Sequence, residues 1–331
     1  MIKTPVCMIS ADNKPLNELI SKRILSVTVT DNRANEADEL SIVLDDHDGA
    51  LQLPKRGVRL NCLMGFKGES LHDKGDFIVD ETEWSGTPDQ ITIKASSANF
   101  KSNIKEAKSK SYHRKTFGAI ATEIAQNHKL TLVMTAALKA ITLSHIDQTN
   151  ESDLNLLQRL AKQNGAEMAV KKDRLLIFTA GSAKTASGKD LPTITLTRNS
   201  GDQFRYSEQD RESDHTGVSA SYQDTGKAKR EKVVNGDKGK VKHLKGTFAN
   251  KAEAERASAA KMAEIKRQMA KFSINLAYGL PEISTESPIK LQGYKSEVDK
   301  LKWIAEKATH NYSKSGGLTT QLDLEAENEL S

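Results

Sequence analysis

The sequence predicts an α+β fold with a β-rich first part, a mixed α/β middle part and a second β-rich part that contains one long helix. In the first hundred residues apolar and polar residues alternate along several short stretches. After Ser111 the apolar spacing becomes that of an amphipathic helix, and the alternation returns after Gly188. A period of two is typical of half-buried strands, and a period near 3.6 is typical of helices. A length of 331 residues is enough for two or three such domains.

Four stretches of the first hundred residues predict strands. Residues 31–35, 48–49, 54–57 and 86–89 are rich in turn-forming types and separate them. Several short antiparallel strands at this spacing suggest a small barrel or a sandwich. The alternating apolar residues are Leu25, Val27 and Val29, then Leu40, Ile42 and Leu44, then Val58, Leu60 and Cys62, and finally Ile91, Ile93 and Ala95.

The middle part predicts two helices packed on short strands. Phe117, Ile120 and Ile124 recur at helical spacing. A second helix is expected to start after a cap at Ser152 or Asp153, and Asn164-Gly165 is expected to end it with a left-handed residue. In chain order we expect a helix at 115–127, a strand at 130–134, a helix at 153–163 and a hairpin of 166–171 with 174–179.

The last part begins with a small, polar, aperiodic stretch at residues 181–188, which predicts a linker. Beyond it the sequence returns to strand patterns, and Gly316-Gly317 predicts a closing hairpin. The expected strands are 194–196, 217–222, 273–278, 289–292, 301–311 and 318–324.

The longest helix is expected at residues 251–272. Asn250 and Glu253 resemble a capping box at its start. Its apolar stripe consists of Met262, Ile265, Met269 and Phe272. Such a stripe either packs on its own domain or lies between subunits, and the sequence leaves both alternatives open.

The positive charge of the chain is local. Residues 225–272 hold fourteen Lys or Arg against five Asp or Glu, which gives +9, so the remainder carries −4 of the net +5. The Lys-rich segment 227–245 could be a phosphate-binding arm. It contains no Tyr, Trp or Phe to stack on bases, so a flexible loop between two strands, either solvated or touching an acidic partner surface, is favoured, and no nucleic acid is expected as partner.

Composition excludes several classes of protein. The two cysteines, Cys7 and Cys62, exclude a disulfide framework and are expected to be small buried hydrophobes. No run approaches the roughly 20 apolar residues of a membrane span. The N-terminus has no apolar segment typical of a secretory signal, so the chain is expected to be made and kept in the cytoplasm.

The search for catalytic chemistry predicts no enzyme and no catalytic, cofactor-binding or metal-binding residue. The acidic pairs Asp45-Asp46 and Asp80-Glu81 do not form dyads, because adjacent residues of a strand point to opposite faces. No nucleophile elbow, phosphate loop or dinucleotide fingerprint is present. No two histidines have the i, i+3 or i, i+4 spacing of a metal site; they are His47, His72, His113, His128, His145, His215, His243 and His310.

Two stretches resemble phage tail proteins. Thr116-Phe117-Gly118-Ala119-Ile120 leads a helix, and residues 148–165 carry Q-x-x-E-S-D, L-x-R-L-A and a final Gly, a pattern similar to that of tail hub proteins. Residues 303–324 resemble the closing segment of the phage late control gene D family. Order and length agree along nearly the whole chain. Within the pattern, Gln148, Glu151, Ser152 and Asp153 are expected to be structural, in a helix start, where acids are favoured, and in the loop before it.

The resemblance implies a baseplate hub of a contractile tail, similar to the T-even phage hub and to the N-terminal part of type VI secretion spike proteins. It implies two β-barrel-like (tube-like) domains, at residues 1–100 and 183–331, with an α/β domain at 101–182 between them. It also implies a homotrimer that joins the six-fold tail tube to the trimeric spike, with the tape-measure protein as a possible further partner. The expected location is the virion, after assembly in the host cytoplasm.

Two other functions remain as alternatives. One is a tail-associated cell-wall hydrolase that would use a carboxylate such as Glu208 or Asp210. The other is nucleic-acid binding through residues 227–245. Under the hub interpretation, the N-terminal β-domain and the C-terminal hairpin are expected to form the ring, with the α/β domain outside it.

Overall fold

A computed structural model describes residues 3–16, 18–33, 36–97, 102–208, 215–224 and 226–327. The chain forms two compact units. Unit 1 consists of Met1–Asn99, Pro192–Tyr206 and Phe272–Leu324, and unit 2 of Phe100–Leu191, Ser207–Lys271 and Glu325–Ser331. Among the described residues, no helix has both the length and the apolar character that a membrane span requires.

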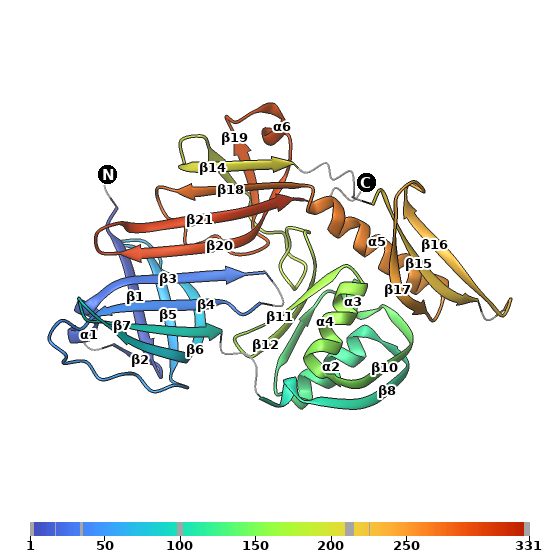
Figure 1. Cartoon of the computed structure of the whole chain (residues 1–331), viewed down its shortest axis with the longest axis horizontal. Coiled ribbons are helices and arrows are strands. Elements are labelled where there is room, and N and C mark those ends of the chain that lie inside the picture. Colours follow the sequence, from blue (N-terminus) through green and yellow to red (C-terminus); the bar gives the residue numbers. More distant parts are fainter. Residues whose placement is uncertain are drawn as a thin grey trace. The chain divides into compact units, whose positions relative to one another are not determined.

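Unit 1 is built on one sheet of thirteen strands (Figure 1). Eleven of them run from edge to edge in the order β14-β18-β21-β20-β3-β4-β7-β6-β5-β1-β2, and β19 pairs with both β20 and β13. Helices α1 (Glu18–Arg23) and α6 (Ser296–Asp299) are short. The strands are β1 Pro5–Ala11, β2 Lys14–Pro15, β3 Ile24–Asn32, β4 Glu39–Asp45, β5 Arg59–Phe66, β6 His72–Ser85, β7 Gln90–Ser97, β13 Ile194–Thr197, β14 Gly201–Glu208, β18 Ala270–Leu276, β19 Pro288–Gln292, β20 Trp303–Ser313 and β21 Gly317–Ala326.

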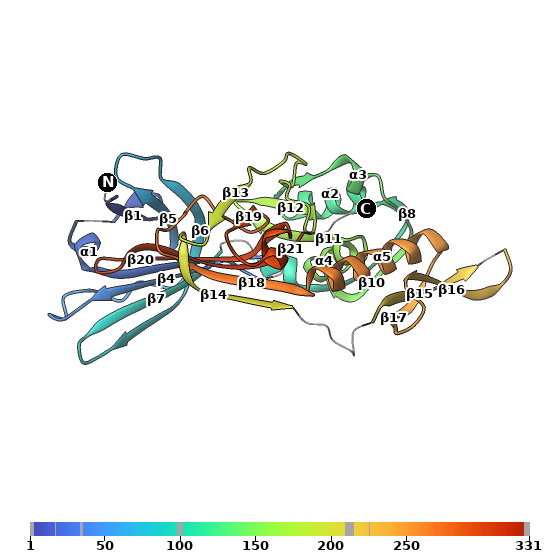
Figure 2. The same ribbon diagram turned by 90° about the horizontal axis from the view of Figure 1, so that it is seen from above.

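The alternation in the first hundred residues does form half-buried strands. In β4 the side chains of Leu40, Ile42 and Leu44 are buried, and the residues between them are at least partly exposed. The same core also contains Leu318 from β21. In Figure 2 the teal hairpin of β6 and β7 extends beyond the neighbouring strands. One apolar core therefore receives side chains from both ends of the chain.

The β3–β20 pair joins the two β-rich parts. Seven residue pairs connect them in antiparallel register, from Asn32 with Lys307 to Ser26 with Ser313. Because of this pairing, the compact units do not follow the expected consecutive domains 1–100, 101–182 and 183–331. Residues 272–324 are grouped with the N-terminal strands, and residues 207–271 with the middle part. That each β-rich part forms a barrel-like domain of its own stays a prediction.

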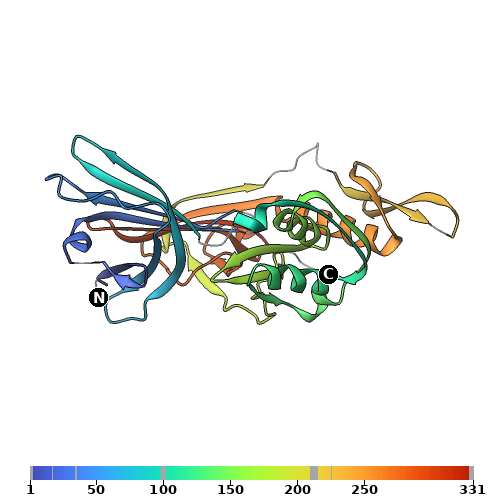
Figure 3. The ribbon, with the colours of Figure 1, turned by 90° about the horizontal axis from the view of Figure 1, so that it is seen from below.

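The described residues of unit 2 form three small sheets, the helices α2 to α5 and the short 3-10 helix η1 (Figure 3). The ribbon β8–β10 is antiparallel, β12 lies between β11 and β9, and β15 lies between β16 and β17. The elements are η1 Ser102–Lys105, β8 Ala107–Thr116, α2 Phe117–Asn127, β9 Thr131–Met134, α3 Ala136–Lys139, β10 Thr142–Ser152, α4 Asp153–Gln163, β11 Ala166–Lys171, β12 Arg174–Thr179, β15 Gly217–Asp224, β16 Lys229–Gly236, β17 Val241–Phe248 and α5 Lys251–Arg267.

Both predicted helices of the middle part are present, and the caps predicted for the second one are confirmed. The Ser152 hydroxyl accepts a hydrogen bond from the Asn155 amide at the start of α4. Gly165 follows the helix with φ +67°, the left-handed conformation that glycine adopts without a steric penalty. Phe117, Ile120 and Ile124 of α2 are fully buried in the core of this unit. The predicted hairpin 166–171 with 174–179 is also present, as β11 and β12.

The predicted helix 251–272 is too long at its C-terminal end. Helix α5 ends at Arg267, and Phe272 lies in strand β18, where it is fully buried. The spacing of Met269 and Phe272 fits a helix, but Phe272 packs instead among the aromatic rings of Tyr294 and Trp303. The predicted stripe is not the buried face either, because Ala254, Ala257 and Ser258 are buried while Met262 and Ile265 are only partly so.

The capping box of α5 is half realised. The Asn250 side chain accepts the Glu253 amide, as predicted. The Glu253 carboxylate, however, accepts the Ser144 amide of β10 at 2.9 Å instead of turning back to the Asn250 backbone. Arg256 also donates to Asn164 at 3.1 Å. These bonds fasten α5 to the mixed α/β part of unit 2.

The prediction of a flexible loop at residues 227–245 is wrong. Most of the segment lies in β16 and in the first half of β17, which pair with the two sides of β15. Charged residues alternate here with Val233 and Leu244, which pack against the core beside α5. The abundance of lysine hides this alternation in the sequence. Residues 181–188 were predicted to be a linker. They form turns that are held by local hydrogen bonds, such as the bond from the Leu191 amide to the Ala183 carbonyl at 3.0 Å.

We predict that Thr116→Ala destabilises helix α2 by about 1 kcal/mol, because the Thr116 hydroxyl accepts the Ala119 amide at 3.1 Å. Amide hydrogen exchange of residues 117–121 measures this effect. Thr116→Ser keeps the oxygen and is the matched control. Equal exchange in the alanine and serine variants would contradict the cap.

Candidate assembly surfaces and buried polar networks

Strand pairing brings together two histidines that the sequence keeps far apart. His113 of β8 lies opposite His145 of β10, and their Nδ1 atoms are 2.9 Å apart. The second ring nitrogen of His145 bonds to Asp147 at 2.8 Å, and this bond, after the one from Ser111, lowers the pKa of Asp147. The residues that the structure describes contain no group of three or more His, Cys, Asp or Glu side chains that could hold a metal ion. Only the strand register could have predicted this pair.

The acidic pairs do not form dyads. Asp45 contacts His47, whereas the neighbouring Asp46 is buried and accepts the Leu51 amide at 2.9 Å. Asp80 accepts from Ser96, whereas Glu81 faces Lys94. Each carboxylate thus serves a separate local contact. Of the carboxylates considered for hydrolysis, Glu208 is exposed in β14, and Asp210 lies outside the described residues.

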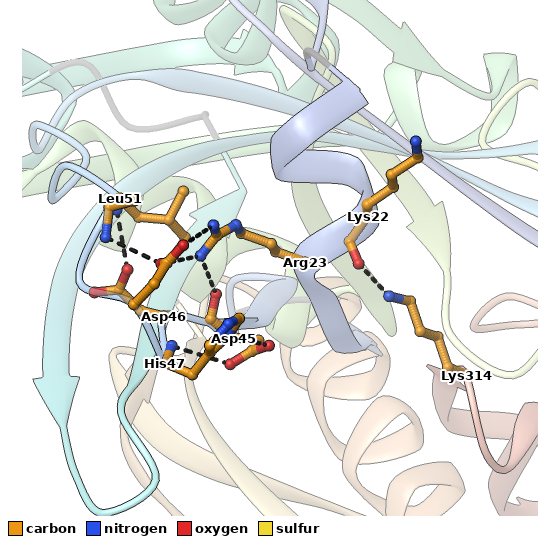
Figure 4. A network of polar contacts seen from close by, with 9 residues as sticks. Lys22, Arg23, Asp45, Asp46, His47, Leu51 and Lys314 are labelled. Atoms are coloured by element: carbon orange, nitrogen blue, oxygen red, sulfur yellow. Dashed lines mark hydrogen bonds and ion pairs between the residues drawn. The ribbon is translucent and has the colours of Figure 1, made fainter.

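A polar network holds the rim of the unit 1 sheet (Figure 4). Both terminal nitrogens of Arg23 donate to the Asp48 carboxylate at 2.6 Å, and one also reaches the Asp45 carbonyl. This fork lowers the pKa of Asp48 well below its usual value. At the same rim, Lys314 donates to the Lys22 carbonyl. The turn of the C-terminal hairpin is therefore bonded to the residues that precede β3.

A second network lies under the centre of the same sheet. His310 of β20 is fully buried, and its Nε2 atom is 3.0 Å from the Lys74 ammonium. The same Nε2 atom is 3.1 Å from the Ile283 carbonyl, and Nδ1 is 2.9 Å from the Thr320 hydroxyl, so both ring nitrogens of His310 have polar partners. Lys74 also donates to the carbonyls of Pro281 and Ile283. Burial, followed by the Lys74 charge, lowers the pKa of His310 to about 3.

A third network contains the residues of the Q-x-x-E-S-D pattern. The Asp153 carboxylate is 1% exposed and receives Lys108 at 2.6 Å and His128 at 2.8 Å. Gln148 donates to the other oxygen of Asp153 at 3.0 Å. Burial acts to raise the pKa of Asp153, but these three bonds outweigh burial and lower it.

Glu151, from the same sequence pattern, forms a separate ion pair next to the Asp153 network. Its carboxylate forms a two-pronged ion pair with Arg159, at 3.0 and 2.7 Å. The expected helix start is confirmed, but the residues before it, which we expected to form a loop, lie in strand β10. The residues of the pattern hold β8, β10 and α4 together.

The two cysteines are both free. Cys62 is fully buried, while Cys7 is partly buried on the neighbouring strand β1. The contact with Cys7 and burial both raise the pKa of Cys62. The expectation of a small buried hydrophobe is confirmed for Cys62.

The outer face of β4, β7 and β6 is acidic. Leu40, Ile42 and Leu44 point into the core, so the alternate residues of β4 point outward. The register aligns these outward residues with those of β7 and β6. We call this surface the acidic face. It carries five carboxylates, Glu39, Asp45, Asp80, Glu81 and Glu83, and one ammonium, Lys94, which pairs with Glu81 at 3.3 Å.

The outer face of β16, β15 and β17 is basic. Ala220, Tyr222 and Val233 point toward Ala254 of α5, so their neighbours along the strands point away from it. We call this surface the basic face. Its exposed residues are Arg230, Lys232, Val234, His243 and Thr247, whereas Ser219 and Ser221 of the central strand are buried. Within the described part of the chain, Arg230 and Lys232 form no ion pair, and Val234 is 42% exposed.

Comparison with known proteins gives a consistent result over almost the whole chain. A family model described as the phage tail baseplate hub (GPD) matches residues 76–316. A probable baseplate hub protein of Escherichia phage 186 is 39% identical in an alignment that covers 97% of this chain and 92% of that protein.

Solved structures share the fold at low sequence identity. The tail protein from Neisseria meningitidis MC58 has a TM-score of 0.71 at 13% identity and covers 97% of this chain and 96% of its own. The E. coli c3393 protein is a type VI secretion component described as structurally similar to the T4 tail proteins gp27 and gp5. It has a TM-score of 0.61 at 10% identity and covers 97% of this chain and 77% of its own.

We predict that His310 makes the chain sensitive to acid. In the folded state its pKa is about 3, against 6.5 when it is solvated, so the unfolded state binds a proton first as the pH falls. The contribution of neutral His310 to the free energy of unfolding is complete above the pKa of the unfolded state. It is lost as the pH falls toward about 3, the pKa of the folded state. Between about pH 7 and about pH 4, wild type should lose about 3 kcal/mol more free energy of unfolding than His310→Gln. Urea unfolding across this range measures the difference.

The control for that experiment is His47→Gln, which removes an exposed imidazole. It should lose as much stability as wild type over the same pH range. An identical pH dependence in His310→Gln and wild type would contradict the burial of a neutral His310.

We also predict that Asp153→Asn destabilises unit 2 by about 2 kcal/mol, because it leaves Lys108 and His128 facing a neutral amide. Asp147→Asn, at an exposed site on the same ribbon, should cost less than about 0.5 kcal/mol. Hydrogen exchange of helix α4 measures both changes. Equal effects of the two substitutions would show that the buried network around Asp153 does not stabilise unit 2.

Proposed function

The chain belongs to the phage tail baseplate hub family and is a structural protein of the baseplate, and from that premise we propose that it acts as a trimeric adaptor. Three copies would form a ring that joins the six-fold tail tube on one side to the trimeric spike on the other. The observation that carries the proposal is the 39% identity to a probable baseplate hub protein over 97% of this chain. The likeness therefore includes both β-rich parts and the α/β part.

The difference in symmetry between a six-fold tube and a trimeric spike explains why an adaptor would be needed. A ring of three chains can match a six-fold tube if each chain supplies two similar interface-forming domains, because each patch must repeat around the axis. The two β-rich parts are the candidates for these domains. Their pairing through β3 and β20 supports such a role, because hydrogen-bonded strands transmit load between the two parts.

An adaptor of this kind needs no catalytic turnover. It would hold its partners passively through many contacts during contraction, with the α/β part outside the ring. The C-terminal hairpin, bonded through Lys314 to the residues before β3, would support the ring. The hydrolase alternative has no such support, because the carboxylates of the pairs Asp45-Asp46 and Asp80-Glu81 contact separate partners.

The test is the solution mass of the 36.4 kDa chain, measured by light scattering with and without the spike protein of the same phage. We predict a particle of about three chain masses, either alone or when the spike is added. A chain that stays monomeric and ignores the spike would overturn the adaptor.

Whether the purified chain clears a cell-wall substrate is a separate measurement. We predict no clearing. Activity that is lost on Glu208→Gln would favour the hydrolase instead.

A further inference from the structure

Two imidazoles on the outer side of the β8–β10 ribbon are arranged like a pair of metal ligands. His113 and His145 are direct cross-strand partners, and their Nδ1 atoms lie 2.9 Å apart. Both side chains are exposed, because the next residues along the two strands, Tyr112 and Ile146, point into the core. We propose that His113 and His145 form an open, two-nitrogen site for a divalent transition-metal ion, with Cu²⁺ preferred. This site is independent of the proposed adaptor function.

The backbone holds the two rings in place before an ion arrives. The register of the ribbon is unbroken from residue 142 to residue 148, on both sides of the histidine pair. Tyr112 is 2% exposed and Ile146 is 8% exposed, and both belong to the apolar core of unit 2. A site built on two fixed strands positions its ligands more precisely than a site on a loop.

The separation of the two nitrogens suits coordination of one ion. A metal–nitrogen bond of about 2.0 Å to each Nδ1 atom gives a nitrogen–metal–nitrogen angle of about 90°. Neighbouring ligands of a tetragonal or octahedral ion have this angle, whereas a tetrahedral zinc ion needs nitrogens about 3.3 Å apart. Cu²⁺ is preferred for a second reason, because it has the highest affinity for nitrogen sites among the first-row divalent ions.

The orientation of the rings also differs from that of a simple hydrogen-bonded pair. The ring centroids of His113 and His145 are 4.5 Å apart. Each centroid lies behind its nitrogen, so this distance is too short for two rings that point straight at one another across a 2.9 Å contact. The rings therefore meet at an angle, as two ligands of one ion do.

Asp147 determines where His145 carries its proton. The Asp147 carboxylate is ionised at neutral pH, because its bonds to Ser111 and His145 lower its pKa. An ionised carboxylate can only accept, so the Nε2–H group of His145 donates to it at 2.8 Å. The lone pair of neutral His145 is then on Nδ1, the atom that faces His113. A carboxylate behind a histidine ligand is common in metal sites, because it orients the ring and raises its basicity.

Binding of the ion requires one change of tautomer. Without an ion, the Nδ1–H group of His113 donates to the Nδ1 lone pair of neutral His145. An ion needs a lone pair on both Nδ1 atoms, so the proton of His113 moves to its Nε2 atom by exchange with water. Two waters leave the ion, two metal–nitrogen bonds form, and no proton is released overall.

Water completes the coordination of the ion. In the part of the chain that the structure describes, no third His, Cys, Asp or Glu joins the two histidines as a ligand. The site therefore differs from a closed structural zinc site, and its ion exchanges with solvent. A bound ion links β8 to β10 and stabilises the ribbon against opening.

The test uses the full-length chain without an affinity tag, and Cu²⁺ alone as the probe. Isothermal titration gives the stoichiometry and the dissociation constant, and electron paramagnetic resonance counts the imidazole nitrogens bound to the ion. The variants are His113→Gln, His145→Gln and Asp147→Ala. The matched control is His47→Gln, which also removes an exposed imidazole in contact with a carboxylate, that of Asp45.

We expect wild type to bind one Cu²⁺ ion through two imidazole nitrogens at this site. Loss of either His113 or His145 should weaken binding at least about tenfold, and loss of Asp147, which only positions His145, should weaken it about tenfold. His47→Gln should bind as wild type does. At a free ion concentration of about 100 times the dissociation constant, hydrogen exchange that requires β8 and β10 to separate should slow about hundredfold.

Three results would overturn the site. Wild type that binds no Cu²⁺ would do so, as would binding that is unchanged in both His113→Gln and His145→Gln. A loss of binding in His145→Gln alone would also overturn it, because one imidazole beside a carboxylate would then explain the binding. None of these results bears on the adaptor, whose test is the solution mass.

Discussion

The architecture of unit 1 depends on the antiparallel pairing of β3 with β20. These strands are nearly 280 positions apart in sequence, yet seven residue pairs place them side by side. The interactions around the pair reinforce it. Thr28 contacts Asn311 across the seam at 2.9 Å, Leu318 enters the N-terminal core, and Lys314 bonds to the carbonyl of Lys22. Without this seam the sheet would separate into an N-terminal and a C-terminal half.

Local order could be predicted from the sequence, because local order follows from spacing. Leu40, Ile42 and Leu44 alternate as a strand with one buried face, and that strand is present. Ser152 is followed by a helical apolar pattern, and the expected cap is present. The pattern beginning at Gln148 correctly indicated a structural helix start.

Features that depend on contacts between distant residues could not be predicted. The spacing of Met269 and Phe272 fits both a helix and a helix followed by a strand, and only packing against Tyr294 and Trp303 decides between them. The alternation in β16 is masked by lysines whose side chains reach solvent. The contact of His113 with His145 depends on a register that no local pattern specifies. The same holds for the seam, because nothing local to β3 identifies its partner.

The chemistry of the chain agrees with a load-bearing function. Its buried polar groups, such as Asp153 and His310, connect strands and helices to one another. Their perturbed pKa values therefore have structural causes. The charged side chains of the acidic and basic faces, by contrast, point away from the apolar cores. A hub requires this combination, because it must remain rigid within each chain and still bind several neighbours at once.

The central claim is that the two β-rich parts share one cooperative sheet, and amide hydrogen exchange of β3 and β20 tests it most directly. The account predicts that both strands are protected and that they become exposed together as denaturant is added. Exchange of β20 at low denaturant while β3 stays protected would contradict it, because the halves would then be separate bodies.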